Sequence, residues 1–216
     1  MTEKPAREGR RETGSARDLR REHKVRQIVR AATAVFLEDG FAAASMDKIV
    51  ERAGVSKRTI YNYYDSKDQI FVDVMQAQLG ELYKDFDIEW DETEGLTAQL
   101  RRVGRDMLRI ANAPVTLALF RITAAEAQRF PKLAQQFFEE RFEKVILGIA
   151  TMLNRAPAKS GIRIDDTRQA AEYFLDLLTG TAFHRVVFGT QPPMDEAAIE
   201  ARTERTLHFF FGTYRS

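Results

Sequence analysis

The segment that decides the fold reads Ser45-Met-Asp-Lys-Ile-Val-Glu-Arg-Ala-Gly-Val-Ser-Lys-Arg-Thr-Ile-Tyr-Asn-Tyr-Tyr64. It predicts two short helices, 46–53 and 57–63, because Ser45 and Ser56 can each accept a hydrogen bond from a free N–H at a helix start. Gly54 tolerates the left-handed conformation that a sharp turn between them needs. Helices this short are marginal in water and must brace each other. The segment therefore predicts a helix-turn-helix.

The second helix of this pair presents outward side chains that suit DNA. Arginine pairs with guanine edges and asparagine with adenine edges, so Arg58 and Asn62 are predicted base contacts. Tyr61, Tyr63 and Lys67 are predicted phosphate contacts, with contact between Tyr61 and a thymine methyl as the alternative. The complete predicted DNA-binding set is Ser45, Lys57, Arg58, Thr59, Tyr61, Asn62, Tyr63 and Lys67. The competing interpretation is a helix-turn-helix that packs only against protein.

Charge is distributed unevenly along the 216 residues. Residues 1–67 hold 15 Lys and Arg against 10 Asp and Glu, whereas the remainder holds 18 against 22. A basic N-terminal part followed by a mildly acidic one favours phosphate binding by the first. The arginines within residues 1–22 could enter an adjacent minor groove, and a solvated, disordered extension is the alternative.

Helical periodicity continues beyond this segment and indicates an all-α chain. Apolar residues recur at three- to four-residue spacing, and no strand-like alternation is visible. The expected helices are 15–38, 46–53, 57–63, 66–86, 93–112, 114–130, 131–154, 165–188 and 195–214. We expect a flexible, partly helical basic arm at 1–22, a three-helix DNA-binding domain at 23–67, and a helical ligand-binding and dimerisation domain at 68–216.

Composition argues against several classes of function. The chain has no cysteine, which excludes disulfides and cysteine-based zinc sites. Its three histidines are isolated, and there is no Gly-rich phosphate loop, nucleophile elbow or paired-acid motif, so we expect no metal, no cofactor and no enzyme activity. No apolar run approaches the roughly 20 residues of a membrane-spanning helix, and no signal-peptide core is visible. We therefore expect a cytoplasmic protein without a membrane partner.

The flanks of the helix-turn-helix extend the pattern into a resemblance to the TetR family. The similarity covers residues 23–75 and rests, in order, on Phe36-Leu-Glu-Asp-Gly-Phe41, Ser45-Met46, Ile49, Ala53-Gly-Val-Ser56, Thr59-Ile-Tyr61, Tyr63-Tyr64 and Ser66-Lys67. Val50 stands where the family usually has alanine. Tyr64 stands where phenylalanine is usual, so its hydroxyl needs a partner or an exit to water.

Residues 119–134 are similar to the C-terminal domain of AefR-like members of that family. The resemblance implies a homodimeric transcriptional regulator, usually a repressor, that binds a palindromic double-stranded DNA operator and responds to a small-molecule effector. It leaves the identity of the effector and the sequence of the operator open.

Two further sets of residues are predicted in the second domain. An effector pocket needs apolar walls with a few polar groups. The candidates are Phe86, Met107, Phe120, Arg121, Thr123, Phe138 and Phe174. The alternative is that the polar members face solvent or a partner. The last two helices carry apolar residues on more than one face, which favours burial against a second copy. The predicted interface residues are Leu178, Ala182, Val186, Phe210 and Tyr214.

Overall fold

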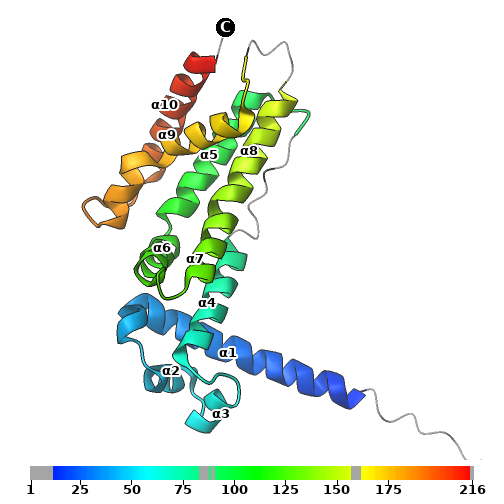
Figure 1. Cartoon of the computed structure of the whole chain (residues 1–216), viewed down its shortest axis with the longest axis vertical. Coiled ribbons are helices and arrows are strands. Elements are labelled where there is room, and N and C mark those ends of the chain that lie inside the picture. Colours follow the sequence, from blue (N-terminus) through cyan, green and yellow to red (C-terminus); the bar gives the residue numbers. More distant parts are fainter. Residues whose placement is uncertain (1–11, 83–87, 89–90, 157–161, 215–216) are drawn as a thin grey trace, which may run out of the picture. The chain divides into compact units, whose positions relative to one another are not determined.

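The computed structural model describes residues 12–82, 88, 91–156 and 162–214. The regular elements in this part of the chain are helices, so the all-α prediction is confirmed (Figure 1). The chain divides into two compact units, which we call the head (residues 1–77) and the body (residues 78–216). Among the helices described, none is both long and apolar enough to cross a membrane.

The head is built from four helices around one core. These are α1 (Glu12–Ala43), α2 (Met46–Ala53), α3 (Lys57–Tyr61) and the first part of α4 (Lys67–Leu82). Phe36, Phe41 and Phe71 form an aromatic cluster at its centre, with ring centroids 4.6 to 5.7 Å apart. Because Phe71 and its neighbours on α4 are buried in this core, the head ends after Ala77 and not at the predicted boundary after Lys67.

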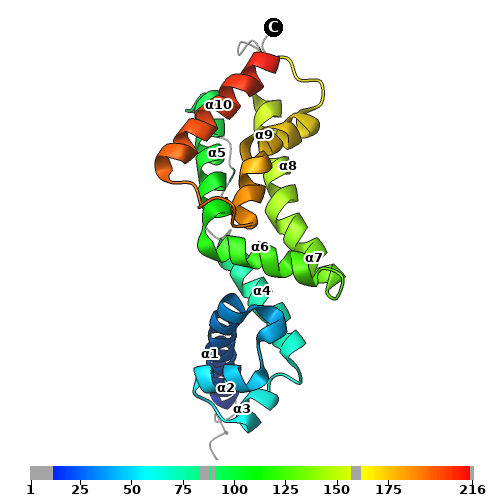
Figure 2. The same ribbon diagram turned by 90° about the vertical axis from the view of Figure 1, so that its left-hand side faces the viewer.

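The body is a bundle in which α5, α8, α9 and α10 pack together, with α6 and α7 against one end (Figures 1 and 2). Its helices are α5 (Leu96–Asn112), α6 (Pro114–Glu126), α7 (Pro131–Phe138), the π-helical η1 (Glu139–Glu143), α8 (Lys144–Arg155), α9 (Thr167–Val187) and α10 (Glu196–Tyr214). A single large cluster of buried apolar side chains from α5, α8, α9 and α10 forms its core. The predicted helices 93–112 and 195–214 match α5 and α10 closely.

In the body, three predicted helices differ from those in the structure. The expected helix 131–154 is divided by η1, whose hydrogen-bond pattern widens between α7 and α8. The expected helix 165–188 is kinked at Gly180, which has φ 44° and ψ −148°. The expected helix 114–130 ends at Glu126.

The kink in α9 is held by a side chain from α10. Arg202 Nε donates to the Leu178 carbonyl at 2.9 Å, and its Nη2 donates to the Leu177 carbonyl at 2.6 Å. In a regular helix these carbonyls would accept from N–H groups four residues later, and the non-helical Gly180 interrupts that ladder. The guanidinium thus satisfies acceptors that the kink releases.

Three ion pairs join α5 to α10 in an antiparallel ladder. The rungs are Arg101–Glu204, Arg105–Glu200 and Arg109–Glu196. The four-residue spacing on both helices places the three arginines on one face and the three glutamates on the face opposite. A single exposed ion pair contributes little to the free energy of unfolding, but several pairs in a network of fixed geometry can contribute measurably.

The ladder predicts an acid-sensitive body. Hydrogen bonds from Arg109 and Arg101 lower the pKa of Glu196 and of Glu204. A carboxyl with a lowered folded-state pKa stabilises the fold above its unfolded pKa, and that stabilisation is lost as the pH falls through the folded pKa. Urea unfolding between about pH 6 and about pH 3 should show a loss of stability that is smaller in Glu204→Gln. Glu92→Gln, at an exposed position, is the control. If both variants lose the same amount of stability between these pH values, the ladder is not the source of the acid sensitivity.

Candidate nucleic-acid interface

Two serines and a glycine determine the geometry of the helix-turn-helix. The Ser45 hydroxyl accepts a hydrogen bond from an N–H in the first turn of α2 at 3.2 Å, and the Ser56 hydroxyl does the same for α3 at 3.0 Å. Gly54 ends α2 in the left-handed conformation, with φ 62° and ψ 36°. These local predictions are confirmed, although α3 ends at Tyr61 and not at residue 63.

Side chains of α1 fix the C-terminal end of α2. Gln27 Nε2 donates to the Ala53 carbonyl at 2.7 Å. Arg52 makes two hydrogen bonds to the Glu38 carboxylate, at 2.7 and 2.5 Å, and these lower the pKa of Glu38. Both contacts are polar and directional, so they hold α2, and the turn that follows it, at a defined place on α1.

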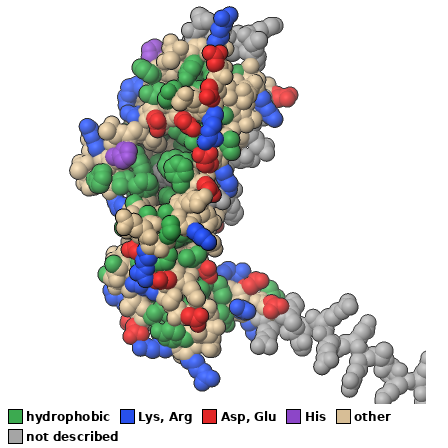
Figure 3. Space-filling view, viewed as in Figure 1, with side chains coloured by type: hydrophobic (Ala, Val, Ile, Leu, Met, Phe, Trp, Pro, Cys, Tyr) green, Lys and Arg blue, Asp and Glu red, His purple; other side chains and the backbone are tan. Residues whose placement is uncertain are grey.

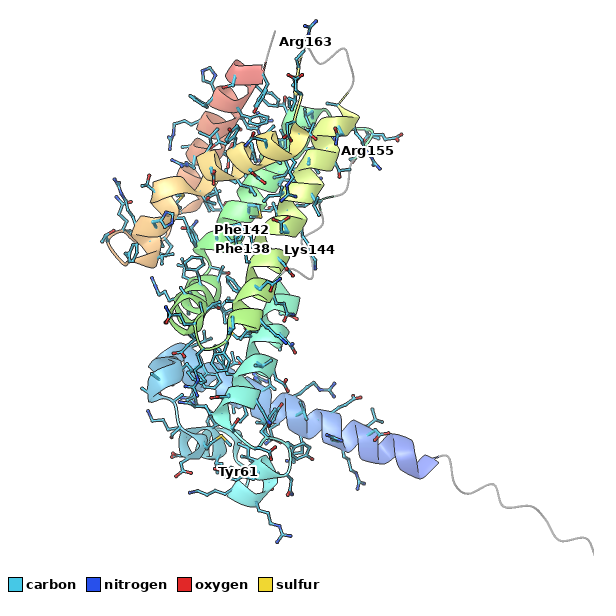
Figure 4. All side chains as sticks on the ribbon, in the orientation of Figure 1. Tyr61, Phe138, Phe142, Lys144, Arg155 and Arg163 are labelled. Carbon is cyan, nitrogen blue, oxygen red and sulfur yellow. The ribbon has the colours of Figure 1, made fainter. Side chains whose placement is uncertain are left out.

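The outer face of α3 carries side chains that are free to meet a ligand. Arg58, Tyr61 and Asn62 are exposed, and in the described part of the chain their side chains have no hydrogen-bond or ion-pair partner. Tyr61 lies on the surface of α3 with half of its area accessible (Figure 4). Lys57 is paired with Asp47 at 2.8 Å, and the hydrogen bond to that carboxylate raises the pKa of Lys57. The face thus offers one unpaired cation and one unpaired amide.

The remaining predicted contacts on this surface are less available. The Thr59 hydroxyl is hydrogen-bonded to Ser56 at 2.8 Å, and the Tyr63 side chain is half-buried. Ser45 is exposed, although its hydroxyl already caps α2. The Tyr64 hydroxyl, which was expected to need a partner or an exit to water, donates a hydrogen bond to the Asp73 carboxylate at 2.7 Å. Burial, followed by this hydrogen bond, raises the pKa of Tyr64.

Lys67 has a different role from the one predicted. Its ammonium donates to the carbonyls of Phe41 at 2.7 Å, Ala44 at 2.8 Å and Ala42 at 3.4 Å, and it lies 4.4 Å from the centre of the Phe41 ring. All three N–H donors of the ammonium are therefore directed at the end of α1. The structure gives Lys67 a capping role there in place of the predicted phosphate contact.

The predicted effector-pocket residues lie at several separate places in the body. Met107 and Phe174 are buried in the main core. Phe138 is 53% exposed and stacks on Phe142 with a centroid distance of 5.0 Å at the junction of α7 and η1 (Figure 4). Phe86 lies outside the described residues. As a single pocket lining, this set is not supported by the structure.

Arg121 also differs from its prediction. Its Nε donates to the Val187 carbonyl at 2.6 Å and its Nη2 to the Val186 carbonyl at 2.9 Å. The exposed guanidinium therefore caps the C-terminal end of α9, where free carbonyls and the helix dipole favour a cation.

Two buried threonines lie on α6, and only one of them was predicted from the sequence as a pocket residue. Thr116 and Thr123 are buried, and neither hydroxyl has a hydrogen-bond partner in the described part of the chain. Phe120 lies between them on the same helix face, and its ring meets Phe183 edge-on at 5.1 Å. Thr123 was predicted. Thr116 was missed, although the seven-residue spacing of two threonines on a helix was a usable signal.

Three of the predicted interface residues are buried inside the chain itself. Leu178 and Phe210 are inaccessible in the main core, and Val186 belongs to a smaller cluster with Phe183. Leu178 and Val186 cannot reach a second copy, so these two predictions are wrong, whereas Phe210 lines the groove between α9 and α10 and stays a prediction. Leu178 and Val186 face inward because α9 and α10 pack on α5 and not only on each other. Ala182 and Tyr214 are half-buried and stay predictions.

The accessible apolar surface of α9 and α10 lies beside those residues. A groove of about 320 Å³ runs between the two helices. Tyr173 on α9 is 50% exposed and Phe209 on α10 is 62% exposed. On the side of the body where α9 and α10 lie, Figure 3 shows hydrophobic side chains gathered at the surface.

Two family models match the chain. Residues 28–74 match the model of bacterial regulatory proteins of the tetR family. Residues 98–216, more than half of the chain, match the C-terminal domain of AefR-like transcriptional repressors. The chain belongs to the TetR family. Both parts of the resemblance seen in the sequence are thereby confirmed for this regulator.

Some curated relatives match the regulator over a short stretch, and others match it over 159 to 179 residues at 23% to 25% identity. The transcriptional activator FasR of Mycolicibacterium smegmatis is 39% identical over 64 residues, which cover 30% of this chain and 29% of that protein. The transcriptional repressor SCO4008 of Streptomyces coelicolor is 33% identical over 69 residues, covering 32% and 36%. The matched stretch thus spans about a third of the length of these two relatives.

Solved structures match over almost the whole regulator. The flavonoid-responsive regulator FrrA is 36% identical with a TM-score of 0.72, covering 90% of this chain and 98% of that one. A TetR-family regulator of Mesorhizobium loti has a TM-score of 0.77 at 23% identity, with the same coverage, and shows the likeness of the fold. The chain is therefore a TetR-family transcriptional regulator with a helix-turn-helix head and a helical body.

Proposed function

We propose that the regulator binds a palindromic DNA operator as a homodimer, represses transcription there, and is released by a small, largely apolar effector. The observation that carries this proposal is the outer face of α3, where Arg58 and Asn62 are exposed and unpaired on a helix whose start is capped. Side chains used only for packing would be buried or satisfied within the chain. Arginine and asparagine are the residues that read guanine and adenine in the major groove.

The homodimer is supported by the groove between α9 and α10. Large exposed aromatic residues such as Tyr173 and Phe209 are costly in water and gain from burial against a second copy. A two-fold axis through this surface would make the same patch serve both partners. Two heads related by that axis require two half-sites, separated by about one turn of DNA (roughly 34–36 Å).

An effector site in the body is supported by Thr116 and Thr123. Buried hydroxyls without a partner are costly, and a bound molecule could satisfy them. Phe120, which lies between them, would contact the apolar part of that molecule. A full-length structural relative is described as flavonoid-responsive, which favours aromatic molecules with hydroxyl groups as first candidates. Binding would shift the dimer toward a state whose two α3 helices no longer match adjacent grooves.

Selection of binding sites from a random duplex pool, at about 0.15 M salt, tests the proposal. Recovery of a palindrome would support operator reading, and its spacing would give the geometry of the dimer. Loss of that binding on addition of hydroxylated aromatic compounds would support the effector class. Retained affinity without any enriched sequence would indicate an architectural DNA binder, and no affinity would indicate a head that serves protein interaction only.

Arg58→Ala should weaken operator binding by about 1–3 kcal/mol and relax the preference at one base of each half-site. The reason is that a base contact contributes to the operator and not to random DNA. Fluorescence anisotropy with operator and with scrambled duplex measures both. Arg155→Ala, at the end of α8 in the body, is the control with the same loss of charge. An equal loss on both duplexes would show that Arg58 contacts phosphate.

A further inference from the structure

The head contains a second basic surface that the helix-turn-helix does not use. A groove of about 590 Å³ lies between α1 and the C-terminal end of α2, helices that pack side by side (Figure 2). Its walls carry His23, Arg26, Arg30 and Arg52, and the rest of the lining is Gln27 and three alanines. None of the described residues that line it carries a carboxylate. The spacing of the basic residues on α1 places them along one helix face.

The carbonyl groups at the floor of the groove are already hydrogen-bonded, so they repel an anion less than free carbonyls would. The carbonyls at a helix C-terminus normally repel negative charge. Here the Ala53 carbonyl accepts from Gln27, and the carbonyls of Glu51 and Val50 accept from the Gly54 N–H that caps α2. Gln27 is itself held from the other side, since Lys24 donates to its Oε1 at 2.8 Å. The small alanine side chains leave room for a group of several atoms.

The basic residues of the groove differ in how far they are already neutralised. Arg52 is committed to Glu38, with two short hydrogen bonds. Arg26 has a loose ion pair with Glu22 at 3.8 Å. Arg30 is exposed, and in the described residues its guanidinium has no partner. The groove therefore has one fully available guanidinium, in Arg30, and a second that a stronger acceptor could recruit.

We propose that this groove binds a phosphate group of the DNA backbone beside the half-site that α3 reads. One wall, at Arg52 and Ala53, directly precedes the turn that leads to Lys57 at the start of α3. The start of a recognition helix lies in the major groove, so the flanking backbone comes within reach of the preceding turn. The proposal rests on DNA binding by the head, and it adds a contact that is independent of base sequence.

The test compares the salt dependence of DNA binding in the full-length chain with and without the groove cations. Each phosphate contact contributes about one unit to the slope of log affinity against log salt. The variants are Arg30→Gln and the double variant Arg26→Gln with Arg30→Gln, and the matched control is Arg155→Gln in the body. Affinities are measured from about 0.1 to about 0.4 M salt, on selected operator and on random duplex. Circular dichroism confirms folding.

We expect Arg30→Gln to weaken binding about five- to tenfold on both duplexes, and to lower the slope by about one unit. The preference for operator over random duplex should stay unchanged. An unchanged slope in the double variant, or the same change in Arg155→Gln, would overturn the proposal. If inorganic phosphate binds in the groove but the variants leave the salt-dependence slope of DNA binding unchanged, the groove is a site for a free anion. That outcome would also overturn the proposal. Because random duplex suffices for the test, failure to find an operator is a separate result.

Discussion

Phe71→Ala should unfold the head and abolish operator binding while the body keeps its structure. Phe71 is buried and meets Phe41 and Phe36 at centroid distances of 4.6 and 5.5 Å, so its removal leaves a cavity among rings that cannot close over it. Such a change costs about 3–5 kcal/mol. A whole domain is stable by only about 5–15 kcal/mol, and the head is small. The loss therefore removes most of its stability.

The measurement is urea unfolding followed by two probes, operator anisotropy for the head and sedimentation for the assembly of the body. Phe71→Leu should show a much smaller loss, because most of the volume is kept. Leu19→Ala is the matched control in the same unit, since Leu19 is 59% exposed on α1 and should change stability by no more than about 0.5 kcal/mol. Simultaneous loss of both signals in Phe71→Ala would show that head and body unfold together.

Local chemistry explains how much of the head could be predicted. Ser45, Gly54 and Ser56 act within a few residues of their own positions, so the residue type alone specifies the cap that each one makes. The apolar periodicity of α1 is equally local. These are features for which the sequence holds both partners of the interaction close together.

Features that join distant residues could not be predicted in the same way. The ladder between α5 and α10 has its four-residue spacing visible on both helices, but nothing in the sequence pairs Arg105 with Glu200, 95 positions away. The role of Lys67 could not be predicted for the same reason. A lysine after a helix-turn-helix suggests phosphate, and only the structure brings the Phe41 carbonyl to its ammonium. The tertiary contact decides the role in both cases.

The selection of interface residues on α9 and α10 failed in part for a related reason. Helical periodicity marks which residues of α9 and α10 are apolar, but not which apolar face meets the rest of the chain. Leu178 and Phe210 belong to the inner face, whereas Tyr173 and Phe209 belong to the outer one. Amphipathic patterns identify a buried face reliably only when the opposite face is polar. Here both faces carry apolar residues, so the sequence left the choice open.

Arg202→Ala should destabilise the body by about 1–3 kcal/mol. The change removes two donors from the Leu177 and Leu178 carbonyls, which the kink at Gly180 has separated from their own helix. The Leu178 carbonyl loses its side-chain donor, whereas the Leu177 carbonyl keeps a longer hydrogen bond from the Thr206 hydroxyl at 3.4 Å, so most of the cost arises at Leu178. Burial lowers the pKa of Arg202, but the guanidinium stays charged, so its hydrogen bonds are the stronger charge-assisted kind.

Urea unfolding at fixed protein concentration measures the effect, because the proposed dimerisation would make stability concentration-dependent. Arg205→Ala is the matched control, since that side chain is exposed on the same helix and should change little. Arg202→Lys should recover only part of the loss, because a single ammonium cannot reproduce the two-donor geometry. Equal stability of the Arg202 and Arg205 variants would mean that the kink persists without its guanidinium. The positive φ of Gly180 would then be maintained by packing of α9 on α5 and α8 alone.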